Sequence, residues 1–369
     1  MGNTIKVVHL PTDLGMRAYS LCRAERELGL DSWMVVKSSG VHVSGWTTPL
    51  ASSNLFLYGL RLLKESLKSF KADVIMANVG LSLLDFRRYN MDLLDIPIYD
   101  LLKKRIIVTY QGCDIRLCET CPVRTSLPSQ LVCPNIIDSY KKSDQIKLKR
   151  FKIWSRYADA ILGITPDLCI MEGIIYTPHV KYIDSNLMLA KKNNQSNSKI
   201  RIGHMSRRHI KGKRIDGVEY LKGTPWIEEQ IKHILDIFPK EVEYVPIEGL
   251  SWNQCLKIIS SCDIVIDQVI SGWYGGISVE AALMGVLPIA YINSKLLCYI
   301  PDFMRENLPV LALENREDLS AVLIDLIQNR DRISQEISRC QQSALNFHDA
   351  KKVAQQLIKK YYEPDHIVK

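Results

Sequence analysis

Runs of β-branched residues alternate with stretches of helical spacing along nearly the whole chain. Residues 5–10 form the first such run, residues 17–28 have helical spacing that stops at Gly29, and residues 32–36 form a second run. Strands that alternate with helices of about 10–15 residues predict βαβ units. Because such units align their strands in one direction, the sequence predicts an α/β fold with parallel sheets.

The alternation is interrupted once and then restarts. Residues 191–198 are polar and lack apolar periodicity, which is typical of a linker or a solvated loop. The 369 residues therefore divide into two predicted Rossmann-like, doubly wound domains, 1–190 and 199–345. A C-terminal helical segment, 346–369, is expected to pack back on the N-terminal domain. Ligands of such domains bind at the carboxyl ends of the strands, and two facing domains form a cleft.

The amino-acid composition excludes several classes of protein. Charged residues make up 24% and hydrophobic residues 47%, which excludes a disordered or low-complexity chain. No run of about 18 apolar residues is free of charge, and the first residues lack the regions of a signal peptide. We therefore expect a cytoplasmic protein with reduced cysteines. Its net charge of +8 suits nucleic acid, a membrane surface or a small anionic substrate as partner.

A glycine pair opens a predicted helix soon after a predicted strand. The strand spans 263–267, the helix spans 276–285, and Gly275 and Gly276 stand at its start. Backbone N–H groups without a neighbouring Cβ, at a helix N-terminus, predict a diphosphate site. The alternative is a turn that only starts a helix. Glu280, one turn later, either stabilises the helix N-terminus or holds a ribose diol.

The basic segment 201–214 is a second candidate for phosphate binding. It follows the first strand of the second domain and carries Arg207, Arg208 and Lys211. These side chains either solvate a loop or neutralise a departing diphosphate, with arginine forking onto phosphate oxygens and lysine acting as a point charge. Neither a P-loop nor a G-x-G-x-x-G motif follows the first strand of either domain. This absence argues against an ATPase and a dehydrogenase.

On these motifs, the second domain resembles the donor-binding half of GT-B glycosyltransferases, most closely the retaining enzymes of glycosyltransferase family 4. The motifs occur in order: Lys211-Gly212, Ser-Cys-Asp-Ile-Val-Ile-Asp at 261–267, Gly275, and Glu-Ala-Ala-Leu-Met-Gly-Val-Leu-Pro at 280–288. The first domain matches more loosely, through Thr-Tyr-Gln-Gly-Cys-Asp at 109–114. The resemblance implies a GT-B fold, in which two Rossmann-like domains face a cleft.

The resemblance also implies roles for individual residues. Arg207 and Lys211 are the implied catalytic residues, because they would stabilise the departing diphosphate. The implied donor-binding residues meet the phosphates, the ribose and the base: Gly15, Arg208, Ile247, Gly275, Gly276, Ile277 and Glu280. No metal or other cofactor is implied for the chemistry.

The implied activity is transfer of a sugar, with retention of anomeric configuration, from a UDP- or GDP-sugar to a glycan or lipid-linked acceptor. Such a reaction would serve surface polysaccharide or glycoconjugate biosynthesis. Two positions depart from the family pattern: Gly272 stands where a glutamate that faces the donor sugar is expected, and Gln111 where a histidine is expected. A non-catalytic GT-B subunit that binds a nucleotide sugar or glycan, and a GT-B nucleotide-sugar epimerase, therefore remain alternatives.

Polar residues follow the predicted strand 105–110 of the first domain. Gln111, Asp114 and Arg116 are candidates for the acceptor side of the cleft. The alternative is a buried ion pair that Asp114 forms with Arg116 or with another cation.

The loop 111–135 contains Cys113, Cys118, Cys121 and Cys133. Four thiolates could form a structural zinc site that holds this loop. The first spacing, with four residues between cysteines, is not that of a standard zinc knuckle. Reduced thiols without a shared role, and a redox or disulfide pair, are the alternatives.

The predicted helix 54–70 and the segment 141–152 place leucine and phenylalanine beside lysine and arginine. Such a helix either packs one face and solvates the other, or docks on anionic lipid headgroups. The second alternative suits a lipid-linked acceptor and predicts a peripheral position at the inner face of the membrane. Aromatic residues are not interleaved with the basic ones, so nucleic acid is not expected as a partner.

Overall fold

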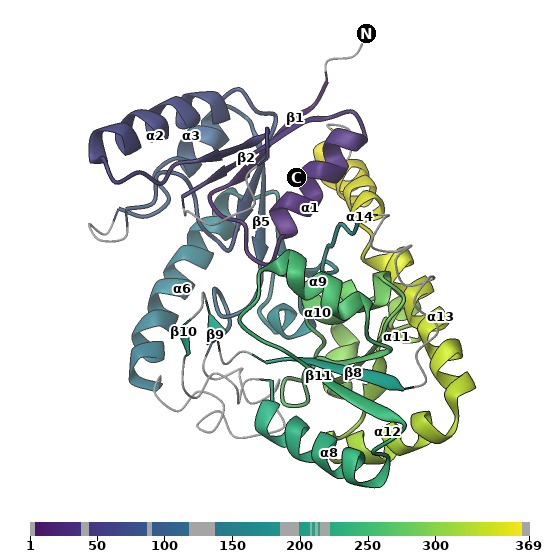
Figure 1. Cartoon of the computed structure of the whole chain (residues 1–369). Helices are drawn as coiled ribbons and strands as arrows, with labels where there is room; N and C mark the ends of the chain where they lie inside the picture. The colour runs from purple at the N-terminus through teal and green to yellow at the C-terminus, as the bar shows by residue number, and fades with distance from the viewer. Residues whose placement is uncertain are drawn as a thin grey trace. The chain divides into compact units, whose positions relative to one another are not determined.

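The structure of the chain is a computed structural model (Figure 1). It describes the following residues: 4–37, 44–86, 91–117, 137–184, 199–206, 209–210, 213–214 and 222–363. They form two compact units. The first contains the described residues of Met1–Leu117, Tyr140–Tyr182 and Ala350–Lys369, and the second those of Cys118–Ser139 and Ile183–Asp349. The C-terminal end of the chain therefore belongs to the first unit, whereas the predicted linker 191–198 lies outside the described residues.

The first unit is built on a seven-stranded parallel sheet in the order β3-β2-β1-β4-β5-β6-β7. Its strands are β1 (Lys6–Leu10), β2 (Asp31–Val36), β3 (Thr47–Pro49), β4 (Val74–Asn78), β5 (Arg105–Tyr110), β6 (Ala160–Gly163) and β7 (Ile175–Tyr176). The chain first adds strands on one side of β1 and then on the other. This reversal is the doubly wound arrangement that the sequence predicts.

Helices connect and cover these strands. They are α1 (Arg17–Glu27), α2 (Leu55–Ser69), α3 (Ile96–Leu101), α6 (Ile137–Tyr157), a 3-10 turn (Pro166–Ile170) and α14 (Ala350–Leu357), which continues as a π-helical turn (Ile358–Tyr362). Helix α14 packs against α1, as Figure 1 shows. The hydroxyl of Tyr362 donates a buried hydrogen bond to Oε1 of Glu25, at 2.7 Å, and so holds the C-terminal segment on α1.

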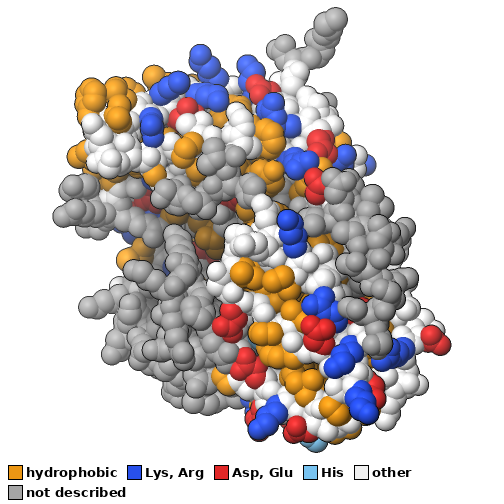
Figure 2. Space-filling model, viewed as in Figure 1, with side chains coloured by type: hydrophobic (Ala, Val, Ile, Leu, Met, Phe, Trp, Pro, Cys, Tyr) orange, Lys and Arg blue, Asp and Glu red, His pale blue; other side chains and the backbone are white. Residues whose placement is uncertain are grey.

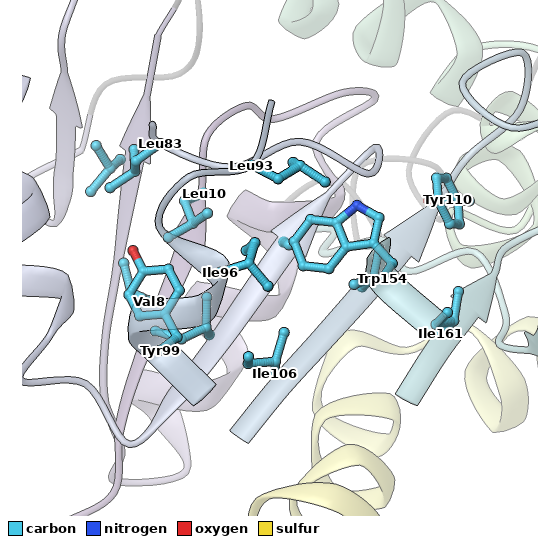
Figure 3. Close-up of a cluster of buried hydrophobic side chains, with 14 of the residues drawn as sticks. Val8, Leu10, Leu83, Leu93, Ile96, Tyr99, Ile106, Tyr110, Trp154 and Ile161 are labelled. Atoms are coloured by element: carbon cyan, nitrogen blue, oxygen red, sulfur yellow. The ribbon is translucent and has the colours of Figure 1, made fainter. Parts of the chain in front are cut away.

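The core of the first unit contains strand residues and large aromatic side chains, among them Tyr99, Tyr110 and Trp154 (Figure 3). Trp154 is fully buried on α6, and its indole N–H donates to the carbonyl of Gly80 at 3.1 Å. A buried indole N–H needs such a partner. This bond therefore fixes α6 to the loop that follows β4.

The second unit has a five-stranded parallel sheet in the order β11-β8-β12-β13-β14. The strands are β8 (Ile200–Met205), β11 (Val242–Ile247), β12 (Ile264–Ile266), β13 (Leu287–Tyr291) and β14 (Leu311–Leu313). The helices are α8 (Thr224–Ile237), α9 (Trp252–Ser260), α10 (Gly276–Leu283), α11 (Asp302–Arg305), α12 (Leu319–Gln328) and α13 (Arg330–Phe347), with 3-10 turns at Ser294–Tyr299 and Arg316–Asp318. The backbones of β9 (His209–Ile210) and β10 (Lys213–Arg214) pair separately and antiparallel.

Two parallel sheets with helices confirm the predicted α/β class. Strands β12 and β13 are buried nearly throughout, which explains why they read as continuous apolar runs and not as alternating ones. Among the helices of the described residues, none combines the length and apolar character needed to cross a bilayer.

Candidate functional site

The candidate site lies at the carboxyl edge of the sheet in the second unit. Strand β8 pairs with β11 on one side and with β12 on the other, so the direction of strand addition reverses at β8. The strands end at Met205, Ile247 and Ile266, which places these three ends at one edge of the sheet. In open α/β sheets, ligands bind at such a reversal point.

Asp267 follows β12 at this edge and is the centre of a buried network. Its carboxylate accepts hydrogen bonds from the Gly275 amide (2.6 Å), the Ser278 hydroxyl (2.8 Å) and the Lys222 ammonium (2.8 Å). Burial would raise the pKa of Asp267, but Lys222 and the two other donors lower it below its ordinary value. The ionised carboxylate therefore joins the end of β12 to the start of α10.

Gly275 immediately precedes α10, and its close approach to Asp267 favours a glycine. A Cβ at this position would lie 3.0 Å from Oδ2 of Asp267. The Gly275 amide is already bonded to that carboxylate. The amides of Gly276 and Ile277 belong to the first helical turn, where N–H groups have no intrahelical acceptor. Of the three amides predicted to cap a phosphate, these two are the better candidates.

Glu280 is one turn into α10 and is buried. Its Oε1 accepts a hydrogen bond from the indole N–H of Trp252, at 3.0 Å. Trp252 is the first residue of α9, and it fixes the orientation of the carboxylate that the resemblance assigns to the ribose.

The ends of β8 and β11 carry polar groups beside Ile247. The hydroxyl of Ser206 donates to Oε1 of Glu248 at 2.6 Å. The side chain of Ile247 itself is fully buried. The base contact of Ile247 that the resemblance implies therefore stays a prediction.

His204, on β8, is a buried histidine that does not act as an acid or base in this arrangement. Its Nδ1 lies 2.8 Å from the carbonyl oxygen of Ile266, and its Nε2 lies 2.8 Å from the hydroxyl of Thr224. Burial and, to a smaller extent, the nearby Lys222 ammonium lower the pKa of His204 to about 4. The neutral ring joins β8 to β12 and to the start of α8.

The predicted basic residues Arg207, Arg208 and Lys211 lie outside the described residues. Their roles stay predictions. The described backbone places Ser206 just before them, at the carboxyl end of β8.

In the first unit, Gly15 lies between β1 and α1, on the carboxyl side of β1. Its φ of +60° is in the left-handed region, and its carbonyl accepts a hydrogen bond from Nζ of Lys181 at 2.8 Å. A Cβ at Gly15 would meet no atom within 4 Å among the described residues. The glycine is therefore required by its backbone conformation and not by packing.

The three acceptor-side candidates follow β5 and differ in their partners. Asp114 accepts from the amides of Gln111 (2.8 Å) and Gly112 (2.5 Å), and burial raises its pKa. Arg116 forms a buried ion pair with Asp167, with 2.5 Å between Nε and Oδ2. The side-chain Nε2 of Gln111 is buried without a hydrogen-bond partner in the described part of the chain. Gln111 thus has a donor that a ligand can satisfy, whereas Arg116 is paired with Asp167.

Of the four clustered cysteines, Cys113 is an exposed free thiol and Cys118, Cys121 and Cys133 lie outside the described residues. Within the ranges that the structure describes, no group of three or more His, Cys, Asp or Glu side chains is arranged to hold a metal ion. The zinc site of this loop stays a prediction.

Sequence reasoning missed Lys222, Trp252 and Ser206. Lys222 and Asp267 are 45 residues apart, and Trp252 and Glu280 are 28 residues apart. No local pattern links either pair. The only signal in the sequence was that each of these residues stands next to an expected strand or helix.

Comparisons with known proteins show which fold this chain has. No family model matches the sequence, and no curated protein matches it significantly. Among solved structures, Anabaena HepE in complex with UDP and glucose has a TM-score of 0.55 at 13% identity, with 97% of this chain and 99% of that chain covered. Sucrose-phosphate synthase from Thermosynechococcus elongatus has a TM-score of 0.55 at 12% identity, with 97% and 98% covered.

A third similar structure is a putative UDP-N-acetylglucosamine 2-epimerase from Listeria monocytogenes. Its TM-score is 0.51 at 14% identity, with 96% of this chain and 95% of that chain covered. At such identities the likeness concerns the fold and extends over nearly the whole chain. Together with the two doubly wound units, it identifies the architecture of this chain as the GT-B fold.

Proposed function

We propose that this chain is a glycosyltransferase that transfers a sugar from a UDP- or GDP-sugar to a glycan or lipid-linked acceptor. The observation that carries the proposal is the start of α10, which brings the Gly276 and Ile277 amides to the carboxyl edge of the sheet. A helix N-terminus at this point of an α/β sheet favours a phosphate. The GT-B fold, and the UDP and glucose bound to HepE, support the same assignment.

In the proposed reaction, the bond between the anomeric carbon and the diphosphate oxygen breaks while the acceptor hydroxyl oxygen forms a new bond to that carbon. The proton of that hydroxyl passes to the departing diphosphate. Negative charge grows on the departing diphosphate, and preorganised donors stabilise it. The amides of Gly276 and Ile277 are such donors, and Arg207 and Lys211 are the proposed cations. Lys222 compensates the negative charge of Asp267, which would otherwise repel the diphosphate.

The remaining assignments follow from the same resemblance. Glu280, oriented by Trp252, is proposed to bind the ribose hydroxyls. The unsatisfied Nε2 of Gln111 is proposed to donate to a hydroxyl of a bound sugar. We propose retention of configuration because the motifs resemble the retaining family 4, with no metal needed for the chemistry and with a role in surface polysaccharide or glycoconjugate biosynthesis.

A panel of donors tests the proposal. The purified chain is heated with UDP-, GDP-, ADP- and CMP-sugars, and its melting temperature is recorded. A ligand at about 100 times its dissociation constant adds about 2.7 kcal/mol of stability. We expect a UDP- or GDP-sugar to raise the melting temperature, and no stabilisation by any member would contradict the proposal.

An epimerase is the second candidate, because the Listeria structure has nearly the same similarity as the other two. Proton NMR of the nucleotide sugar in D2O separates the two activities. An epimerase that works through C2 exchanges the proton there and forms the epimer without an acceptor. A transferase releases the nucleoside diphosphate and depends on the acceptor. Donor binding with neither result would favour the non-catalytic subunit.

A further inference from the structure

Helix α2 exposes a continuous apolar face in the first unit. Phe56, Leu60, Leu63 and Leu67 follow one another at intervals of four, three and four residues, so they line one side of the helix. Their exposed fractions are 71%, 48%, 59% and 56%. We call these four residues the α2 stripe.

The packed side of α2 is the more polar one. The residues that it buries are Leu62, Glu65, Ser66 and Ser69. A helix of a soluble protein ordinarily buries its apolar side and exposes its polar side. The α2 stripe therefore adds nothing to the core of its unit, and an exposed apolar face of this extent is typical of an interaction site.

Basic residues lie along one flank of the stripe. At 100° per residue, Arg61, Lys64 and Lys68 fall on one adjoining side of the helix, and all three are exposed. The only acidic residue of α2, Glu65, is buried. Figure 2 shows hydrophobic side chains gathered over α2, at the upper left, with Lys and Arg side chains beside them.

Helix α3 lies beside the C-terminal end of α2 and also exposes leucines. Its Tyr99 contacts the C-terminal end of α2 through a hydrogen bond to Ser69 (2.8 Å) and an edge-on contact with Phe70 (5.6 Å between ring centroids). Leu101 and Leu102, at the end of α3, are 81% and 45% exposed. The two helices are thus neighbours that both present leucines to solvent.

In the second basic segment, which lies on α6, two of the described cations are buried. On α6, the Lys147 ammonium is buried and donates to the Arg116 carbonyl at 2.6 Å. Arg150 is also buried and forms an ion pair with Asp85, at 2.5 Å. Both side chains are buried and form their contacts within the unit. The lipid-docking interpretation of 141–152 is therefore wrong for these two residues.

We propose that the α2 stripe, with the exposed leucines of α3, docks on an anionic lipid bilayer surface. Fifteen residues of α-helix span about 22 Å, so α2 suits a position in the plane of the interface. Leucine and phenylalanine enter the acyl boundary while Arg61 and Lys64 meet anionic headgroups. The Lys68 ammonium lies 4.7 Å from the centroid of the Trp33 ring. A second copy of the chain is a poorer occupant, because α2 exposes no acidic residue to pair with these cations.

This surface deepens the proposed function, since it would bring the enzyme to a lipid-linked acceptor, but lipid binding does not depend on glycosyl transfer. Vesicle binding is measured without nucleotide, and donor binding is measured without vesicles. Failure of one proposal is therefore distinguishable from failure of the other.

The test is flotation of the full-length chain with vesicles of phosphatidylcholine alone or mixed with phosphatidylglycerol. We expect flotation with the mixed vesicles, and a loss of about tenfold or more in partitioning for the triple variant Leu60→Gln/Leu63→Gln/Leu67→Gln. Ile237→Gln/Phe303→Gln removes two exposed apolar residues of the second unit and should float like wild type. Each of Arg61→Gln and Lys64→Gln should weaken binding about fivefold, whereas Lys232→Gln on α8 should not.

Because the stripe is exposed, the triple variant should keep the wild-type melting temperature. If it unfolds, the single variant Leu63→Gln provides the same comparison. Equal flotation of wild type and stripe variant, or no flotation of wild type with anionic vesicles, overturns the proposal. A wild-type dimer in light scattering that the triple variant abolishes, without vesicle binding, would assign the stripe to a second copy instead.

Discussion

The ammonium of Lys222 lies 2.8 Å from Oδ1 of Asp267, and both side chains are almost completely buried. The same carboxylate bonds the Gly275 amide and the Ser278 hydroxyl at the start of α10. One ion pair therefore connects the segment before α8, the end of β12 and the first turn of α10. The position of the candidate phosphate-binding amides depends on it.

Removing the cation should be costly. Lys222→Met leaves a buried carboxylate without its ion partner, and we expect a loss of about 3–5 kcal/mol in the free energy of unfolding. Urea denaturation measures this loss. Adding Asp267→Asn to the same chain should recover part of it, because an amide carries no charge.

Lys232→Met is the matched control, since Lys232 is exposed on α8 and should change stability by less than about 0.5 kcal/mol. If Lys222→Met were as stable as this control, the ion pair would have no structural importance.

The pH dependence of stability follows from the lowered pKa of Asp267. A carboxyl group whose folded pKa lies below its unfolded value of about 3.9 stabilises the fold above that value. This contribution is lost as the pH falls through the lower folded pKa. We expect Asp267→Asn to lack this part of the acid-induced loss, as measured by denaturation between neutral pH and about pH 3. Identical pH profiles for the variant and wild type would be inconsistent with an ionised Asp267.

Trp252→Phe should affect both stability and donor binding. The variant removes the indole N–H that donates a hydrogen bond to Glu280. Loss of a hydrogen-bond donor to a buried carboxylate lowers the free energy of unfolding by about 1–3 kcal/mol. Affinity for the donor should fall as well, because the carboxylate proposed to bind ribose loses one of the contacts that orient it. Trp226→Phe is the control, because Trp226 lies on α8 beside Arg316. A stability loss without any change in donor affinity would separate Glu280 from ribose binding.

Gly223→Ala should destabilise the second unit through two effects. The φ of Gly223 is +80°, and a Cβ there would lie 2.6 Å from Cγ2 of Val269. Backbone strain and overpacking together predict a loss of about 2–5 kcal/mol, measured by urea denaturation. Gly249→Ala separates the effects, because Gly249 has a φ of +68° but open space around its Cβ. Equal losses in the two variants would show that packing at Gly223 is irrelevant.

Much of the fold could be predicted from the sequence, because its long strands are continuous β-branched runs and its helices have clear spacing. The short edge strands β3, β7 and β14 were not predicted, since two or three residues carry no periodic signal. Asn329, with φ −117° and ψ 70°, separates α12 from α13. Nothing in the local pattern marks that break.

The candidate site could be predicted only where its chemistry is local. Gly275, Gly276 and Glu280 stand in one short segment, so their pattern was visible. Lys222 looked like any other surface lysine, because its burial depends on a partner in another element. Leucines on α2 would ordinarily be assigned to a core, and their exposure is a property of the tertiary structure.

The most direct test of the account is calorimetry of donor binding to Gly276→Pro and Gly276→Ala, with UDP-glucose and GDP-mannose as probes. Proline is well tolerated at the first position of a helix, and both variants add a Cβ, but only proline removes the amide donor. If that amide binds the diphosphate, Gly276→Pro should bind about 10- to 100-fold more weakly than Gly276→Ala. Equal affinities in the two variants, or no binding of either probe by the wild-type chain, would contradict a nucleotide-sugar site at the start of α10.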